Sequence, residues 1–276
     1  MKFWAVSLAL VPLIVNAACG GRKQATTGNG TLSGNWQISL TGQTNPTPLI
    51  FTGFMLQSNN SVSGNLILGP TPSSTPCTGV SPITGTVVNS VPMNVSLTIN
   101  EFAQEISLQG TLSPLAGQFS YQTGNCAPST GTGTWSAVQV QPLTGNFNGT
   151  FTSTATKAVL AVTGTLTQGP NTGGSTASIS GTMQETSANF CPYIGQATVS
   201  GMISGTTVLL DLYGANGELI TQLGQLGQLN NGACAGSAAC VLVTPDANSV
   251  TGGYTFPSIS SACPADAGTL QFTFSN

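Results

Sequence analysis

The sequence predicts an all-β protein built from two tandem copies of a small antiparallel meander barrel, each with about eight strands. Apolar residues recur at every second position over short segments, which is the period of a half-buried strand. Charged residues make up only 4% of the 276 residues, so the polar positions fall to Ser, Thr, Asn, Gln and Gly, several of which are weak helix formers. The second half of the chain also echoes the first. A pair of β-sandwiches is the alternative architecture.

The period of two is clearest in the first half of the chain. Every second position of 93–99 is apolar and the positions between are polar, as expected where one face of an antiparallel sheet is buried. Turns that contain Asn, Ser, Pro or Gly separate such segments. The expected strands of the first copy are 34–41, 48–57, 61–68, 82–89, 92–99, 103–112, 116–123 and 132–140.

Two similar phrases open the two copies, LSGNW at 32–36 and LTGNF at 143–147. Further matches follow in the same order, and ordered matches indicate internal duplication. They pair VSGNLILGP (62–70) with VTGTLTQGP (162–170), the segment after Cys77 with that after Cys191, GQFSYQTGNC with GGYTFPSISSAC, and GTGTWSA with AGTLQFTFS. The predicted copies are residues 32–140 and 143–276. The second is longer, mainly through insertions near 169–176 and 217–240.

The N-terminal segment predicts export from the cytoplasm. Residues 1–18 combine a positive start with an apolar run of thirteen residues, the pattern of a signal peptide. The end of this segment, Ala17-Ala18-Cys19, resembles the cleavage site of bacterial lipoproteins, although Asn16 stands where that family usually has an aliphatic residue. The resemblance implies that Cys19 carries fatty acyl chains such as palmitate and that the protein is anchored in the cell envelope, most simply at the outer membrane. Residues 19–31 are then a flexible tether, and ordinary secretion is the alternative.

The cysteine count agrees with a lipid on Cys19. Of seven cysteines, six remain to pair, as expected outside the cytoplasm. In an up-and-down barrel the loops after odd-numbered strands emerge at one end, and each copy carries a cysteine after its third and its seventh strand. A further pair lies six residues apart in the second insertion. We therefore predict the disulfides Cys77–Cys126, Cys191–Cys263 and Cys234–Cys240.

The opening of the first copy also resembles that of lipocalin-like and avidin-like barrels. The matching residues are Gly34, Asn35 and Trp36, and in those families the tryptophan closes one end of the barrel. The resemblance implies the same place for Trp36 and for Phe147 in the second copy. The lipocalin arginine that stacks on this tryptophan is missing, since no arginine follows Arg22.

Several kinds of chemistry are excluded by composition. The chain has no histidine, which removes the commonest general base and metal ligand and every Ser-His-Asp or Cys-His arrangement. It has no phosphate-binding loop and no cluster of Lys and Arg for nucleic acid, so we expect no cofactor, no metal site and no nucleic-acid partner. Glu101 and Glu105 are the closest carboxylates, about 13 Å apart if they share one strand. Asp211 interrupts an apolar run and is expected to face solvent.

We therefore expect a non-enzymatic, lipid-anchored protein that binds a glycan or a small apolar ligand. The alternative is a structural or adhesive surface lipoprotein without a small-molecule ligand, and a carboxylate-dependent glycosidase is the remote one. Aromatic residues that could line a ligand site, or alternatively pack in a core, are Trp36, Tyr121, Trp135, Phe147 and Tyr254. The sequence does not define an oligomeric state.

Overall fold

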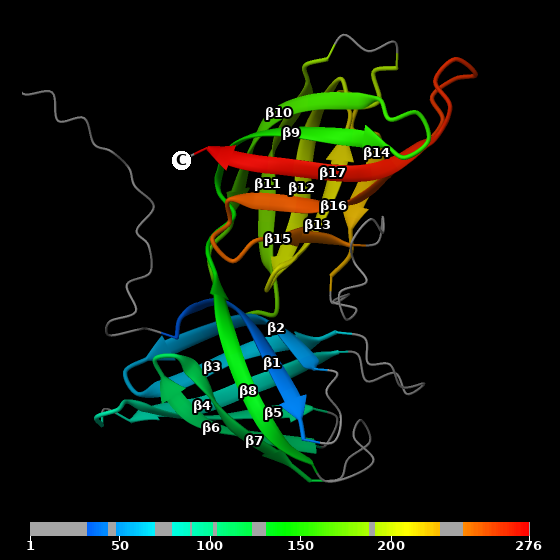
Figure 1. Cartoon of the computed structure of the whole chain (residues 1–276). Coiled ribbons are helices and arrows are strands. Elements are labelled where there is room, and N and C mark those ends of the chain that lie inside the picture. The colour runs from blue at the N-terminus through cyan, green and yellow to red at the C-terminus, as the bar shows by residue number, and fades with distance from the viewer. Residues whose placement is uncertain are drawn as a thin grey trace, which may run out of the picture.

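The computed structural model describes residues 32–43, 48–69, 79–88, 90–101, 104–122, 131–187, 191–226 and 240–275. Over these residues the protein is all β, with seventeen strands and no helix, and every strand pair is antiparallel (Figure 1). The strands form two closed barrels, one in each predicted copy. The predicted fold class is confirmed, and the closed sheets replace the sandwich alternative. The predicted signal peptide and tether, residues 1–31, lie outside the described residues.

The first barrel is a simple meander in which each strand pairs with the next and the eighth returns to the first. Its strands are β1 (Gly34–Gly42), β2 (Leu49–Ser58), β3 (Ser61–Leu68), β4 (Val80–Val88), β5 (Asn94–Glu101), β6 (Gln104–Leu112), β7 (Leu115–Tyr121) and β8 (Gly131–Val140). All eight predicted strands are present, with ends that differ by at most two residues. The alternation of buried and exposed positions explains this agreement, because it recurs in nearly every strand.

The second barrel has the same plan with one strand divided. Its strands are β9 (Gly145–Ser153), β10 (Val159–Gln168), β11 (Ala177–Glu185), β12 (Gln196–Ser204), β13 (Thr207–Tyr213), β14 (Leu219–Gly224), β15 (Val241–Val243), β16 (Ser249–Phe256) and β17 (Asp266–Ser275). One edge of β13 pairs with β12, while its other edge is shared between β14 and the short β15. These two strands together take the place of β6, and β14 lies in the described part of the predicted insertion at 217–240.

The structure repeats the local geometry of LSGNW in LTGNF. Trp36 pairs with Gly53 across the sheet, and Phe147 pairs with Gly164 in the same way. Both rings are buried in the cores of their barrels, with 7% of Trp36 and 2% of Phe147 exposed. Gly34 and Gly145 precede these two residues by two positions. Their φ values are 146° and 144°, a region that favours glycine. The repeated phrase therefore specifies the same backbone conformation at the start of the first strand of each barrel.

One of the sequence matches between the copies is wrong by one strand. Residues 62–70 include β3, but 162–170 include the end of β10, which is the equivalent of β2. The equivalent of β3 is β11, since Gly64 and Gly181 occupy the same place in their barrels. The error arose because a hydroxyl-glycine pattern recurs in neighbouring strands. A Cβ on Gly64 would meet the backbone of β2 at 2.1 Å, so several strands need a glycine where they cross a neighbour closely.

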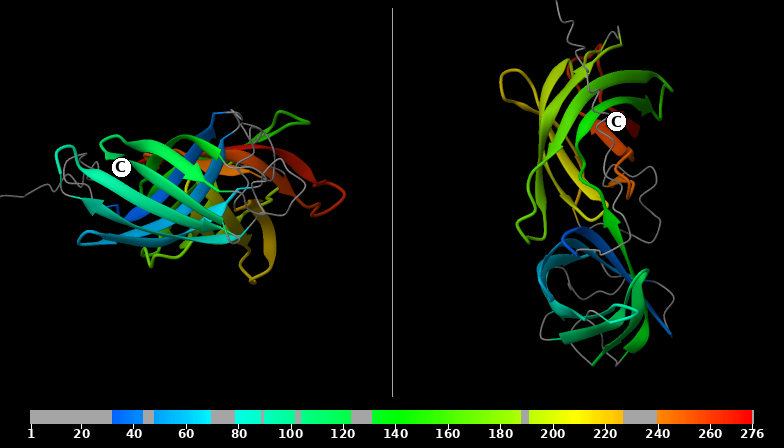
Figure 2. Two further views of the ribbon diagram at one scale, coloured as in Figure 1. Left: turned by 90° about the horizontal axis from the view of Figure 1, so that it is seen from below. Right: turned by 90° about the vertical axis from the view of Figure 1, so that its left-hand side faces the viewer.

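The two barrels lie next to each other (Figure 2), and a polar, buried contact joins them. The side-chain amide of Asn35 donates to the carbonyl of Gly205 (2.8 Å) and accepts from its N–H (2.7 Å). Gly205 lies in the turn between β12 and β13, and the hydroxyls of Ser204 and Thr52 are 2.9 Å apart beside it. The outer face of β1 and β2 thus receives a turn of the second barrel.

The predicted insertion near 169–176 forms the other half of this junction. Asn171 donates to the carbonyl of Met55 (3.0 Å), and the carbonyl of Gly173 accepts from Asn65 (2.9 Å). Phe54, on the outward face of β2, packs with the core residues of the second barrel and is 1% exposed. The two barrels therefore share apolar as well as hydrogen-bonded contacts.

Candidate ligand pocket of the second barrel

A pocket of about 390 Å³ opens at one end of the second barrel. It is bounded by the turn between β9 and β10, by residues 191–193 and by the loop between β16 and β17. Its lining is mostly apolar and consists of Phe151, Ala155, Thr156, Ala158, Leu160, Cys191, Tyr193, Tyr254, Phe256, Pro264, Ala265 and Asp266. Four of these are aromatic, so the pocket is a concave site with a largely apolar wall.

A disulfide holds two loops of this end together. Cys191 is bonded to Cys263 across 72 residues of sequence, with the Cα atoms 5.2 Å apart. This prediction is confirmed. Cys240 is also disulfide-bonded, while Cys234, Cys77 and Cys126 lie outside the described residues. Because Cys191 lines the pocket, the bridge fixes the residues that form its rim.

A carboxylate with two hydroxyl partners forms the polar part of the lining. Asp266 accepts from Ser153 Oγ at 2.7 Å and from Tyr254 Oη at 2.6 Å, one on each carboxylate oxygen. Burial raises the pKa of Tyr254 above its usual range, and the hydrogen bond to Asp266 and its negative charge raise it further. Tyr254 therefore remains a hydrogen-bond donor that holds the carboxylate.

Tyr193 forms a wall between this pocket and a second one. Its ring stacks on Phe256, with centroids 5.1 Å apart and planes at 10°, and its hydroxyl donates to the carbonyl of Pro264 (2.7 Å). Burial, and then the charge of Asp266, raise the pKa of Tyr193. Since Tyr193 lines both cavities, the position of one side chain separates them.

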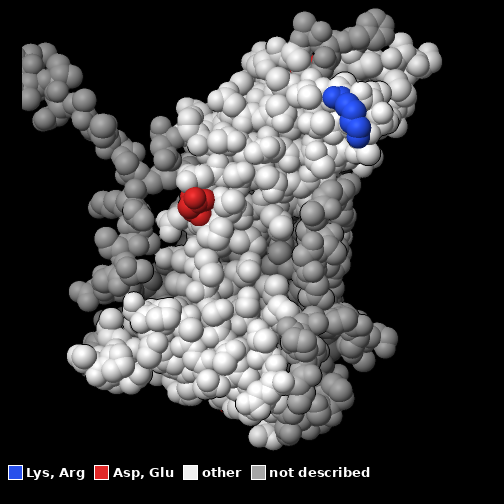
Figure 3. Space-filling view, in the orientation of Figure 1, with Lys and Arg blue, Asp and Glu red and all other residues white. Residues whose placement is uncertain are grey.

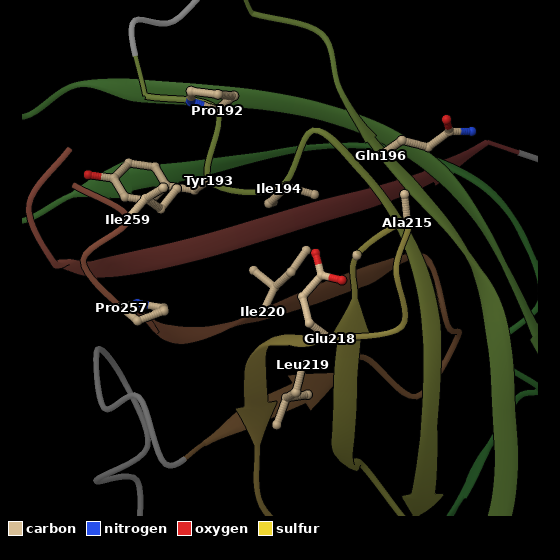
Figure 4. A pocket seen from close by; sticks show the side chains of 11 residues that line it. Pro192, Tyr193, Ile194, Gln196, Ala215, Glu218, Leu219, Ile220, Pro257 and Ile259 are labelled. Carbon is tan, nitrogen blue, oxygen red and sulfur yellow. The ribbon is translucent and has the colours of Figure 1, made fainter. Parts of the chain in front are cut away.

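The second pocket has a volume of about 360 Å³ and lies between the β13–β14 hairpin and the two disulfide-linked loops (Figure 4). The side chains of Ile194, Ile220 and Glu218 point toward one another across it. Leu219 and Ile259 line it as well, and they are 54% and 55% exposed. This cavity therefore has exposed apolar side chains in its lining.

The first barrel lacks the polar group of the larger pocket. The strand registers place Gly42 where the second barrel has Ser153, because each stands opposite a glycine of the last strand. By the same registers Phe119 takes the place of Tyr254, and Gly131 takes that of Asp266. All three polar residues are therefore particular to the second copy.

The five aromatic residues predicted as candidates lie in different places. Trp36 and Trp135 belong to the core of the first barrel, where the indole N–H of Trp135 donates to the carbonyl of Gln109 (3.1 Å). Phe147 packs in the core of the second barrel against two phenylalanines of β17. Tyr121 is half-buried at the end of β7. Tyr254 is the one candidate of the five that lines the pocket.

The sequence reasoning missed Asp266, Tyr193 and two phenylalanines of the lining. A usable signal was present, because Tyr193 follows Cys191 by two residues and Asp266 follows Cys263 by three. A predicted disulfide at one barrel end brings its sequence neighbours to the same end. The spacing to those cysteines was thus more informative than the aromatic residue type.

The other carboxylates form no shared site in the part of the chain that the structure describes. Glu101 ends β5 and Glu105 belongs to β6, so the two residues lie on neighbouring strands, where Glu105 stands opposite Asn100. Asp211 is partly exposed on β13 and accepts from the side chain of Gln222 (2.8 Å). Among the described residues no three His, Cys, Asp or Glu side chains gather as a metal site would require, and no helix is long and apolar enough to cross a membrane.

Glu185 stands near the same barrel end, and its pKa is raised. Burial raises its pKa, and hydrogen bonds from the backbone N–H groups of Gly195 and Ile194 (both 3.4 Å) partly oppose this. These bonds fix the loop that carries Tyr193. We assign Glu185 to the support of the pocket, since it does not belong to its lining.

The comparisons with known proteins transfer no residue roles to this chain. No family model matches it, and no curated protein or solved structure is similar enough to count as a match.

Proposed function

We propose that this protein is a lipid-anchored binding module of the cell envelope that holds a small, largely apolar ligand in the larger pocket of its second barrel. The observation that carries the proposal is the aromatic-lined cavity of about 390 Å³ at the disulfide-bonded end. This volume falls within the range of about 300–1,000 Å³ for small-molecule sites. Apolar surface that a ligand covers there is removed from water, which favours binding.

The hydrogen-bonding groups of the lining favour an apolar ligand over a glycan. The hydroxyls of Tyr193 and Tyr254 already donate to Pro264 and Asp266. A sugar has a hydroxyl on most of its carbons, and each one that is buried needs a partner. The pocket offers mainly the remaining acceptor capacity of one carboxylate, which suits a compact ligand with a single polar group.

A binding role is also favoured over hydrolysis. A glycosidase needs two carboxyl groups on opposite sides of the scissile bond, and Asp266 is the one carboxylate in the described lining of this pocket. Both of its oxygens already accept hydroxyl bonds. These contacts suit a positioned recognition group.

The second candidate function is a structural or adhesive role, and one observation favours it. The face in Figure 3 is almost free of charged residues. Hydroxyl side chains line up across the outer wall of the second barrel, where Thr165 and Thr182 lie 3.2 Å apart and Thr198 pairs with Thr182 on the next strand. Such rows offer many weak hydrogen bonds to another envelope surface.

A filled-pocket variant separates the two functions. Ala158 lies exposed at the pocket edge, so Ala158→Trp should occupy the cavity without disturbing the core. The mature protein is screened against small apolar compounds by calorimetry, and hits should lose at least tenfold in affinity in the variant. Thr182→Trp, on the outer wall, is the matched control and should leave the hits unchanged. An absence of hits, or equal binding to all three proteins, would favour the adhesive role.

The anchor is tested separately by mass spectrometry of the purified native protein. A diacylated N-terminal Cys19 is the expected result. An unmodified chain that begins before Cys19 would replace the lipid-anchored part of the proposal with ordinary secretion. The pocket would not be affected by that outcome.

A further inference from the structure

We propose that the ligand of this pocket carries a protonated amine, which the Asp266 carboxylate receives while the apolar part of the ligand packs among the aromatic rings. The inference depends on the proposed function, because it names the ligand class for the same pocket. It makes Asp266 the residue that determines specificity.

The first support is the missing counter-charge. The two side chains that donate hydrogen bonds to Asp266, Ser153 and Tyr254, are neutral hydroxyls. A carboxylate held against an apolar wall loses part of its hydration, and a cation placed beside it offsets that loss. Each carboxylate oxygen still has acceptor capacity after one hydroxyl bond, so an ammonium group can bind without displacing Ser153 or Tyr254.

The second support is the aromatic wall beside the carboxylate. Phe151, Tyr254 and Phe256 contact one another with ring centroids 4.8–5.2 Å apart, and Tyr193 stacks on the last of them. The faces of aromatic rings are electronegative and attract ammonium groups, most strongly where water is excluded. Rings together with a carboxylate therefore favour a cation over a neutral alcohol of the same shape.

The third support is the electrostatic field that the net charge of the second barrel produces. Residues 143–276 contain five acidic residues against one lysine, Lys157, which gives a net charge of −4. Such a field attracts cations and repels anions.

The fourth support comes from the repeat. The first barrel keeps the strand register but has Gly131, Phe119 and Gly42 at the three equivalent positions. In the second barrel the acid and both of its donors are present together, and each donor holds a different carboxylate oxygen. A surface charge would not need two dedicated donors, whereas a recognition group benefits from a fixed orientation.

The test compares three probes of similar shape in the full mature protein, namely 2-phenylethylamine, 2-phenylethanol and phenylacetate. Calorimetry at pH 7 should give an affinity at least tenfold higher for the amine than for the alcohol, with phenylacetate weakest. Asp266→Asn should remove the preference for the amine. Asp246→Asn removes the same unit of charge from an exposed turn of the same barrel and should keep it.

Each outcome separates the two proposals. If the alcohol binds as tightly as the amine, or if the preference survives in Asp266→Asn, the amine assignment fails and the apolar pocket stands. If no probe binds and the apolar screen also finds nothing, the proposed function fails with it. Should Asp266→Asn not fold, the three-probe comparison on the unchanged protein still decides, and Tyr254→Phe, which keeps the charge, should retain the preference with a lower affinity.

Discussion

Replacing Asn35 by alanine should weaken the docking of the two barrels, whereas the same change at Asn146 should have little effect. The two asparagines hold the same place in LSGNW and LTGNF. Asn35 is 2% exposed and bonds both the N–H and the carbonyl of Gly205, while Asn146 is exposed to solvent. The pair therefore compares one residue in two environments.

The magnitude follows from the two hydrogen bonds. Each contributes about 1 kcal/mol net, and a buried group that loses its partner costs about 1–3 kcal/mol. Gly205 is buried, so the change leaves two such groups without a partner. We expect Asn35→Ala to cost about 2–4 kcal/mol and Asn146→Ala less than about 0.5 kcal/mol, as for an ordinary surface substitution.

The assay uses urea unfolding with two probes. Trp36 and Trp135 lie in the first barrel and the second has no tryptophan, so fluorescence reports the first barrel. Hydrogen exchange at the Gly205 amide reports the junction. Asn35→Ala should lower the fluorescence midpoint and speed exchange at Gly205. Equal effects of the two substitutions, or unchanged exchange in Asn35→Ala, would show that the amide contributes nothing to docking.

Three further results are expected for the second barrel. The double substitution of Cys191 and Cys263 by alanine should lower its free energy of unfolding by about 4 kcal/mol, because the bridge closes a loop of 72 residues; calorimetry that finds less than about 1 kcal/mol would contradict this entropic account. Tyr193→Ala should join the two cavities, so that apolar ligands with longer chains bind by calorimetry, and an unchanged length limit would show that Tyr193 is not the wall. Hydrogen bonds from Thr244 and from the Asn248 backbone hold the pKa of Asp246 below its usual value, so its contribution to stability is present above about pH 4 and is lost as the pH falls further. The melting temperature should therefore fall less between pH 7 and pH 3 in Asp246→Asn, and an identical fall in both proteins would contradict this.

The strands could be predicted because, along most of them, side-chain polarity matches burial. Inward positions are apolar and outward positions are Ser, Thr, Asn or Gln, so the alternation places each strand and shows which face it buries. Barrel closure is harder to predict from the sequence, because it depends on strand registers in which glycines allow two backbones to approach closely. Gly53 and Gly64 each face a backbone that a Cβ would strike, and a sequence shows the glycine without showing which strand it meets.

The junction between the barrels could not be predicted from the sequence, because many of its contact residues are polar. Asn35 and Thr52 occupy outward positions where polar residues are expected on any solvent-exposed face. One signal was available, because Phe54 and Met55 are adjacent apolar residues within a strand. Adjacent apolar residues on a strand point to opposite faces, so both faces of β2 had to be covered there.

The pocket could not be read from aromatic residues alone. On an inward strand position an aromatic ring packs into the barrel core, as Trp135 and Phe147 do. A ring lines a cavity only where loops leave space at the barrel end, and loop geometry is not encoded in the alternation. The disulfide was predictable from topology, and it marks the end at which that space is found.

The repeat explains why the candidate pocket and the docking surface lie at different ends of the second barrel. Loops after its even-numbered positions, 169–176 and the β12–β13 turn, meet the first barrel. Loops after its odd-numbered positions carry the disulfide and the pocket, and in an up-and-down barrel these emerge at the opposite end. Thr165 of the second copy corresponds to Phe54 of the first, and Gly131 of the first corresponds to Asp266 of the second. The first barrel thus differs from the second at the outer face that docks, and the second differs from the first at the end that carries the pocket. The junction holds the pocket end away from the first barrel.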